Sequence, residues 1–171
     1  KGRIIHKTGE NENEKKYSYD ELIPDHQSGM DKLAKLISDP EIGVISDVNE
    51  VKLVGHRIVH GGDRFHSITR INDRVKEAIV ELSNLAPLHN PANLIGINTA
   101  EHVFPYAKQV AVFDTAFHQS IPETAFRYAL PERFYKVNGI RAYGFHGTSH
   151  RYVSRIAAEF FGRSASFIVA R

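Results

Sequence analysis

Short runs of β-branched and apolar residues, separated by amphipathic segments, constrain the fold of this chain more than any other feature. The runs cover residues 51–60, 109–113 and 166–170. Runs of this kind favour buried strands. Between them, apolar residues recur at the spacing of a helix. Strands that alternate with helices predict an α/β fold built around a sheet.

Helical periodicity marks four segments that we predict to be helices, over 28–38, 72–84, 90–102 and 148–161. Asn72 and the pair Asn90-Pro91 are typical of helix starts, because asparagine caps the first N–H groups and proline is favoured at the first helical position. The polar stretch 9–21 contains almost no aliphatic residue. We expect it to be an exposed loop or the tip of a hairpin.

Composition and charge exclude several classes of protein. Lys and Arg number 22 and Asp and Glu number 20, with both signs interspersed, so no basic surface for nucleic acid is indicated. No run approaches the roughly 18 apolar residues of a membrane span, and the start of the chain has no apolar signal core. The absence of Cys excludes disulfides and thiolate metal sites. We therefore expect a cytoplasmic protein that binds neither nucleic acid nor membranes.

Arg57 is the most conspicuous charged residue, because it interrupts the apolar run 51–60 between Gly55 and Ile58. A charge inside a buried strand must be paired or must face a ligand. The planar guanidinium suits a carboxylate or a phosphate. The residues alone leave two interpretations open, which are a structural ion pair with a core carboxylate and a binding site for an anionic ligand.

Asp114 follows the apolar run 109–113, at the carboxyl end of the predicted strand. Ligand sites of open α/β sheets lie at the carboxyl ends of strands, so this position favours a functional role. Thr115 and His118 provide polar neighbours. A cap for the following loop and a role linked to a metal ion fit the same position equally well.

His146 lies in the segment 143–150, just before a helix that we expect to start at Thr148 or Ser149. The N-terminus of a helix favours anions. His146 and His150 have the spacing of a metal-binding pair. However, the glutamate of the zinc protease motif is missing and no third ligand is evident, so a zinc site is disfavoured.

Other motifs indicate structure rather than chemistry. His56 and His60 would lie about 13 Å apart on one face of a strand, too far for one metal, so we expect buried, hydrogen-bonded imidazoles. The segment 85–94 predicts a rigid turn between two helices, with Leu88 and His89 on it. The glycines form no known phosphate-binding motif.

Four motifs, taken together, resemble the acetate kinase family in order and at plausible spacing. They are GHRIVHGG (55–62), LAPLHNPANLIGI (85–97), VAVFDTAFHQ (110–119) and YGFHGTSH (143–150). The resemblance implies the two-lobe α/β fold with a ribonuclease H-like core that sugar kinases share with Hsp70 and actin, and assembly as a homodimer. Residues 1–115 would form most of the first lobe, and 116–171 would begin the second, nucleotide-binding lobe.

The resemblance also implies the reaction ATP + acetate = acetyl phosphate + ADP, by direct in-line transfer with Mg²⁺. Arg57 would bind the carboxylate, and His146 would stabilise the transferring phosphoryl group. Asp114 would be the catalytic carboxylate. We favour a role in which it orients the Mg²⁺ shell through water, because the acid substrate is already ionised at neutral pH. Proton transfer by Asp114 is the alternative. A small apolar pocket would complete the substrate site, formed by Val59, Leu88 and Phe145.

Parts of the family pattern are absent from this sequence. An early Asn-x-Gly-Ser-Ser-Ser motif, the Gly-rich nucleotide motif and the later Arg and Glu do not occur. We therefore expect an internal fragment that supplies no nucleotide-binding and no direct metal-binding residue, and that is inactive alone. A propionate kinase is the alternative within the family. A non-catalytic α/β interaction domain is the alternative outside it, and the spacings of the ten His disfavour a His-rich metal-binding protein.

Overall fold

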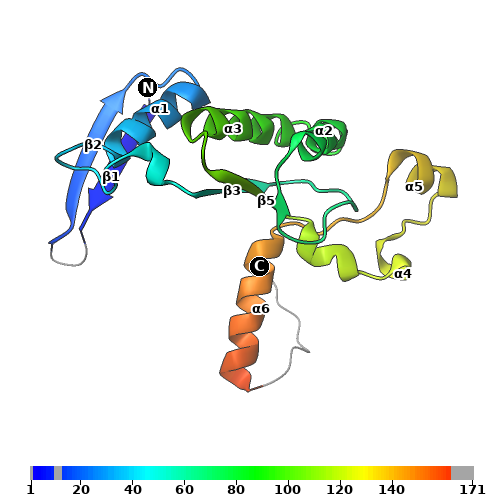
Figure 1. Ribbon diagram of the computed structural model, residues 1–171. Helices are drawn as coiled ribbons and strands as arrows, with labels where there is room; N and C mark the ends of the chain where they lie inside the picture. Colours follow the sequence, from blue (N-terminus) through cyan, green and yellow to red (C-terminus); the bar gives the residue numbers. More distant parts are fainter. Residues whose placement is uncertain (1, 10–12, 163–171) are drawn as a thin grey trace. The chain divides into compact units, whose positions relative to one another are not determined.

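The computed structural model describes residues 2–9 and 13–162 of the chain (Figure 1). The chain divides into two compact units. The first unit lies within Lys1–Val54 and Ile95–Gln109, and the second lies within Gly55–Leu94 and Val110–Arg171. No helix in the described ranges is long and apolar enough to cross a membrane. The strand expected over 166–170 lies outside the described residues.

An antiparallel hairpin opens the first unit. Strands β1 (Gly2–Thr8) and β2 (Lys15–Glu21) pair along their whole length, and Figure 1 shows them as two adjacent blue arrows. The prediction of a loop or hairpin tip over 9–21 is therefore wrong from Lys15 onward. The signal for the strand was the alternation of Tyr17 and Tyr19 with polar residues, because aromatic side chains at a period of two favour a half-buried strand.

Helix α1 (His26–Ile37) confirms the helix predicted over 28–38 and begins slightly earlier. Asp25 caps it, since its Oδ1 accepts from the backbone N–H of Ser28 at 2.7 Å. The same hydrogen bond lowers the pKa of the Asp25 carboxyl group. A 3₁₀ helix follows over Val48–Glu50 and leads into the sheet.

A three-stranded sheet has the order β3-β5-β4. Its strands are β3 (Leu53–Ile58), β5 (Lys108–Phe113) and β4 (Thr69–Arg70), and β4 is antiparallel to β5. Backbone hydrogen bonds at both ends of the β3–β5 pair keep the same offset along the chain, so these two strands are parallel. Their carboxyl ends therefore lie at one edge of the sheet, where Asp114 N donates to the Ile58 carbonyl at 2.9 Å.

Strand β3 is shorter and more exposed than predicted. A buried strand was expected over 51–60, but Leu53 is 59 % exposed and the Arg57 side chain is 63 % exposed, whereas Ile58 is fully buried. The reason is that β3 is an outer strand, which has a neighbouring strand on one side only, so that only part of it contacts the core. Arg57 therefore carries its charge in contact with solvent.

Helices α2 (Asp73–Glu81) and α3 (Asn90–Val103) confirm the helices predicted over 72–84 and 90–102. Asn72 is the cap of α2 as expected, because its side chain accepts from the backbone N–H of Val75 at 3.0 Å. A 3₁₀ turn over Leu82–Asn84 ends α2. The boundary signals therefore predict both helix starts, although Asn90 is the first residue of α3 and not the residue before it.

The core of the second unit gathers apolar side chains from the sheet, α2 and the turns beside them. The buried residues are Ile58, Ile71, Val75, Ile79, Leu82, Ala86, Ala111 and Phe113. The Phe113 ring stacks on Phe65, with ring centroids 4.1 Å apart. This packing fixes the end of β5, and with it the position of the residue that follows, Asp114.

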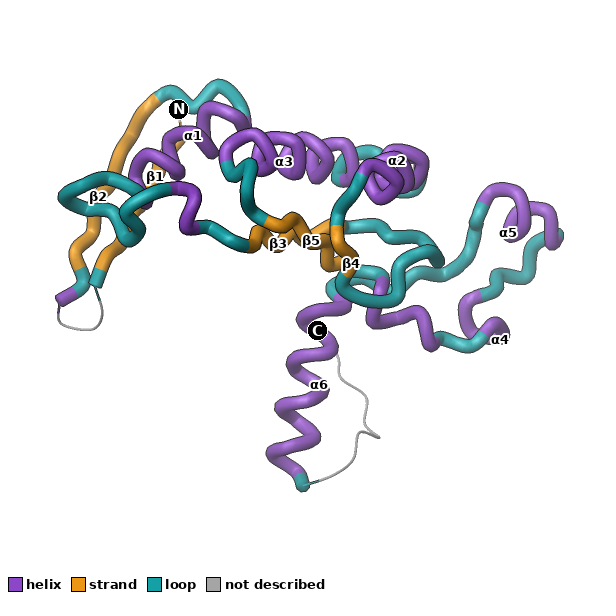
Figure 2. The backbone as a smooth tube through the Cα atoms, in the orientation of Figure 1, coloured by secondary structure: helices purple, strands orange, loops and turns teal. Residues whose placement is uncertain are grey.

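Between β5 and α6 the chain alternates between loops and short helices, as Figure 2 shows. These are a 3₁₀ helix over Ala116–Ser120, α4 (Glu123–Phe126) and α5 (Glu132–Asn138). The Arg141 guanidinium lies over the Phe126 ring, 3.5 Å from its centroid. Helix α6 (Gly147–Phe161) begins immediately after His146, one residue earlier than the first expected start.

Candidate active site

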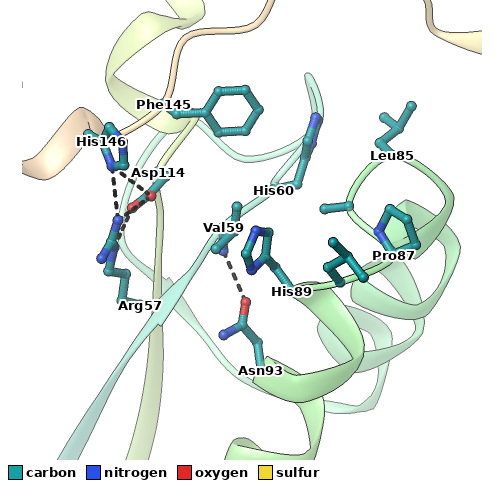
Figure 3. Close-up of a pocket in the computed structure, with 12 residues that line it drawn as sticks. Arg57, Val59, His60, Leu85, Pro87, His89, Asn93, Asp114, Phe145 and His146 are labelled. Carbon is teal, nitrogen blue, oxygen red and sulfur yellow. Dashed lines mark hydrogen bonds and ion pairs between the residues drawn. The ribbon is translucent and has the colours of Figure 1, made fainter.

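A pocket of about 630 Å³ lies in the second unit, beside the carboxyl ends of β3 and β5. All six residues predicted for the site line it, namely Arg57, Val59, Leu88, Asp114, Phe145 and His146. Figure 3 shows the charged members on one side of the pocket, with Leu85 and Pro87 on the opposite side. The structure therefore brings the predicted residues into one cavity, although they come from segments far apart in the sequence.

Arg57 and Asp114 form a bidentate ion pair. Arg57 Nε donates to Asp114 Oδ1 at 2.9 Å, and Nη2 donates to Oδ2 at 2.8 Å. The Asp114 side chain is only 2 % exposed, and its hydrogen bonds raise the pKa of the Arg57 guanidinium above the ordinary value. The structural ion pair considered for Arg57 therefore exists, and its core carboxylate is itself a candidate site residue. The pair fixes the orientation of the Arg57 guanidinium at the pocket.

His146 completes a cluster of three with this pair. Its Nδ1 lies 3.0 Å from Arg57 Nη2 and 3.7 Å from Asp114 Oδ2. A guanidinium nitrogen can only donate, so Nδ1 accepts and the imidazole in this contact is neutral, with its proton on Nε2. The cluster therefore offers a hydrogen-bond donor, Nε2–H of His146, beside a cation.

The backbone of the pocket wall is held by side chains of α3. Beyond the end of β3, Val59 N donates to Asn93 Oδ1 at 3.1 Å, and His60 N donates to Asn90 Oδ1 at 3.1 Å. Asn90 is fully buried and also donates from Nδ2 to the His60 carbonyl at 3.0 Å. Sequence reasoning missed both asparagines. The available signal was their spacing of three residues on the first turn of a helix.

His60 is a buried, hydrogen-bonded histidine, as predicted, although it lies past the end of β3 rather than on it. It is 2 % exposed, and its Nδ1 accepts from Gly62 N at 3.0 Å. Its ring packs edge-on against Tyr143 and Phe145, with centroids 4.6 and 5.4 Å away. Burial lowers the pKa of His60, so the imidazole stays neutral in the folded protein.

The described residues do not make a magnesium site by themselves. No group of three or more His, Cys, Asp or Glu side chains within 2–9 and 13–162 is arranged to hold a metal ion. Asp114 is the one carboxylate among the described residues that line the pocket, and both of its oxygens accept from Arg57. A hard cation prefers several oxygen ligands, which this donor set lacks.

The chain is similar to known proteins in both sequence and structure. Residues 3–170 match the model of the acetokinase family. An acetate kinase of Clostridium botulinum is 51 % identical over 151 residues, which cover 88 % of this chain and 38 % of that protein. The acetate kinase of Porphyromonas gingivalis superposes with a TM-score of 0.80 at 43 % identity, covering 90 % of this chain and 39 % of that one.

A propionate kinase of Francisella tularensis superposes equally well, with a TM-score of 0.80 at 37 % identity over 87 % of this chain and 38 % of that one. These structures confirm the expected α/β kinase fold. The chain spans about 38 % of the length of the curated relatives that it matches. Because the family model covers nearly the whole sequence and the relatives are about half identical, the chain belongs to the acetokinase family.

Proposed function

We propose that this chain carries the carboxylate-binding part of an enzyme that transfers the γ-phosphoryl group of ATP to acetate. A carboxylate oxygen would form the new O–P bond, the bond between the β-bridging oxygen and the γ-phosphorus would break, and ADP would leave. The supporting observation is the Arg57 cation, which lies at a pocket whose other walls include Val59, Leu88 and Phe145. A small carboxylate needs such a combination of one cation and an apolar wall.

Arg57 would bind the substrate carboxylate and reduce its repulsion with the phosphate groups. The Nε–H group and one N–H group of Nη2 donate hydrogen bonds to Asp114, and the second N–H group of Nη2 donates to His146. Among the contacts of the described residues, the two protons of Nη1 remain for a ligand. Asp114 would thereby orient the guanidinium, in addition to orienting the hydration shell of Mg²⁺ through water.

His146 would stabilise the transferring phosphoryl group by a hydrogen bond from Nε2–H. Phosphoryl transfer depends on positioning and on stabilising charge at the equatorial oxygens, so one well-placed donor contributes directly to the rate. The start of α6 directly after His146 places backbone N–H groups next to it, which also favour anions. No proton transfer by Asp114 is required, because the attacking carboxylate is ionised.

The full-length protein would then be a cytoplasmic homodimer that uses ATP and Mg²⁺. The lobe boundary would fall between residues 115 and 116, so that 116–171 begin the nucleotide-binding lobe. The described residues contribute no nucleotide site in this proposal. The 171-residue chain alone is therefore expected to be inactive, whereas the full-length protein is active.

A propionate kinase is the second candidate function, and the fold of the Francisella tularensis propionate kinase supports it. Val59 is the residue that we expect to crowd the end of the acyl chain. Burial of one additional CH₂ group would favour propionate by only about 0.8 kcal/mol, or about fourfold, so crowding by Val59 must exceed this amount for acetate to be preferred, and the discrimination should be modest. Butyrate should be a poorer substrate than either.

The test is the formation of acyl phosphate, trapped as hydroxamate, by the full-length protein with ATP and Mg²⁺. Acetate, propionate and butyrate are compared by kcat/KM, and the 171-residue chain is assayed beside them. Acetate ahead of propionate supports the first proposal, and the reverse order supports the second. No acyl phosphate from any of the three would overturn both.

A further inference from the structure

His146 has an unusual backbone conformation that needs an explanation. Its φ is 54°, which makes it the one non-glycine residue with positive φ among residues 2–9 and 13–162. A residue with a Cβ atom rarely adopts the left-handed backbone conformation. Such a conformation persists only where the surroundings impose it, so contacts on both sides of His146 must hold it.

The contact after His146 is made by Asp114. Gly147 N donates to the Asp114 carbonyl at 2.9 Å, and Gly147 lies so close to this oxygen that a Cβ atom there would collide with it. The backbone of Asp114 thus holds the chain on one side of His146. The side chain of the same residue lies 3.7 Å from the His146 imidazole.

The contact before His146 is made by His118, a residue that the proposed mechanism does not use. His118 Nε2 lies 2.9 Å from the Phe145 carbonyl, which can only accept, so Nε2 carries a proton and donates. Gly144 packs against the His118 ring, and a Cβ atom there would collide with it. His118 therefore fixes the peptide group that joins Phe145 to His146.

Both contacts come from one short segment that follows β5. Asp114 directly follows the strand, and His118 lies in the 3₁₀ helix Ala116–Ser120 just after it. The segment holds the chain on either side of His146, and so directs its imidazole toward Arg57 and Asp114. The neighbouring His150 ring, 5.5 Å from the His118 ring, packs edge-on against it.

We propose that His118 is a positioning residue for phosphoryl transfer, which keeps His146 in its left-handed conformation through the hydrogen bond to the Phe145 carbonyl. The proposal rests on the function proposed above. It differs from a purely structural role, because the effect of His118 must pass through His146. Loss of the hydrogen bond should lower kcat and leave the binding of the carboxylate to Arg57 nearly unchanged.

A matched pair of variants in the full-length protein tests this. In His118→Gln, the amide nitrogen takes the place of Nε2 and can still donate. In His118→Asn, the same amide is one CH₂ group shorter and does not reach the Phe145 carbonyl. We expect kcat to fall about tenfold to a hundredfold in His118→Asn, with the KM for acetate within about threefold of the unmodified protein, because a displacement of about 1 Å has effects of this size. His118→Gln should retain kcat within about threefold.

The variant His146→Ala provides the link to the mechanism. Adding His118→Asn to it should cause no further loss of kcat, because residues that act as a unit are not additive. Equal kcat values for the Asn and Gln variants, or additive losses in the double variant, would overturn the role of His118. An unmodified protein without activity, or His146→Ala with full activity, would instead overturn the proposed function, so the two failures are distinguishable.

Discussion

At the scale of single residues, the Arg57 guanidinium holds the charged cluster together. Three of its N–H groups are used inside the protein, two by Asp114 and one by His146. A planar fork with five donors in fixed directions can do this and still present Nη1 to a ligand. An ammonium group has three donors on a flexible stem, so it cannot keep all these contacts at once.

Arg57→Lys in the full-length protein should therefore lower kcat/KM for acetate by about 100-fold, because the buried Asp114 carboxylate loses one of its two charge-assisted hydrogen bonds and the ligand loses the Nη1 donors. The charge is retained, so the loss reports the geometry of the fork rather than the presence of a cation. Steady-state kinetics with ATP held at saturation would measure it.

Arg3→Lys is the matched control for this substitution. Arg3 also forms a bidentate pair, with Asp20 at 2.7 and 3.0 Å, but both side chains are more than half exposed on the β1–β2 hairpin. Exposed ion pairs contribute little, so kcat/KM should stay within about twofold. If Arg57→Lys were as mild as Arg3→Lys, the fork of Arg57 would have no catalytic importance.

At the scale of elements, α3 extends the hydrogen bonding of β3 past the end of the strand. The backbone N–H groups of residues 59, 60 and 61 donate to the side-chain oxygens of Asn93, Asn90 and Thr115, respectively, at 3.0–3.1 Å. Buried backbone groups must be paired, and here side chains replace the neighbouring strand. The wall of the pocket is therefore built by a helix start and not by the sheet alone.

Asn90→Ala should destabilise the folded protein by about 2 kcal/mol, because it leaves the buried N–H and carbonyl of His60 without their partner. Denaturant-induced unfolding would measure the change. Asn98→Ala is the control, since Asn98 is exposed on the same helix and its replacement should change stability by no more than about 0.5 kcal/mol. Equal effects of the two substitutions would contradict the role given to Asn90.

The elements also show where prediction from sequence succeeds. Helix α2 was predicted because its start signal, the Asn72 cap, acts within one turn. The pair Asn90-Pro91 marked the start of α3 correctly, although the Asn90 side chain bonds to the backbone of His60 and does not cap the helix. The strand β2 was missed, since its pairing partner β1 decides its structure and polar residues dominate its sequence. Local capping is encoded in adjacent residues, whereas pairing and exposure depend on distant ones.

At the scale of the whole molecule, Arg57, Val59 and Asp114 share one pocket because the parallel strands β3 and β5 have their carboxyl ends on the same side of the sheet. The turn before α3 adds Leu88, and the segment before α6 adds Phe145 and His146. This grouping could be predicted from the motifs and from the family resemblance. The supporting contacts of Asn90 and His118 could not, because each joins a side chain to a backbone group about 30 residues away in the sequence. Their importance depends on the folded geometry, which no local pattern records.

Global stability should depend on pH through His60. Burial lowers its pKa in the folded state from the ordinary value of 6.5. Below about pH 6.5, His60 is protonated in the unfolded chain but remains neutral in the folded protein until the pH approaches its lower folded-state pKa. The contribution of His60 to stability is therefore complete above about pH 6.5 and is lost as the pH falls toward the lower folded-state pKa. Protonation would also bring a charge between the rings of Tyr143 and Phe145.

His60→Asn keeps an acceptor for the Gly62 N–H but cannot ionise. Its melting temperature at neutral pH should be lower than that of the unmodified protein, because the packing against Tyr143 is lost. Between about pH 7 and pH 5, however, the variant should lose less stability than the unmodified protein, so the melting temperatures of the two proteins should converge as the pH falls. His26→Asn, which replaces an exposed imidazole on α1, should keep the pH dependence of the unmodified protein. A parallel decline of His60→Asn and the unmodified protein would show that another group, and not His60, couples protonation to unfolding.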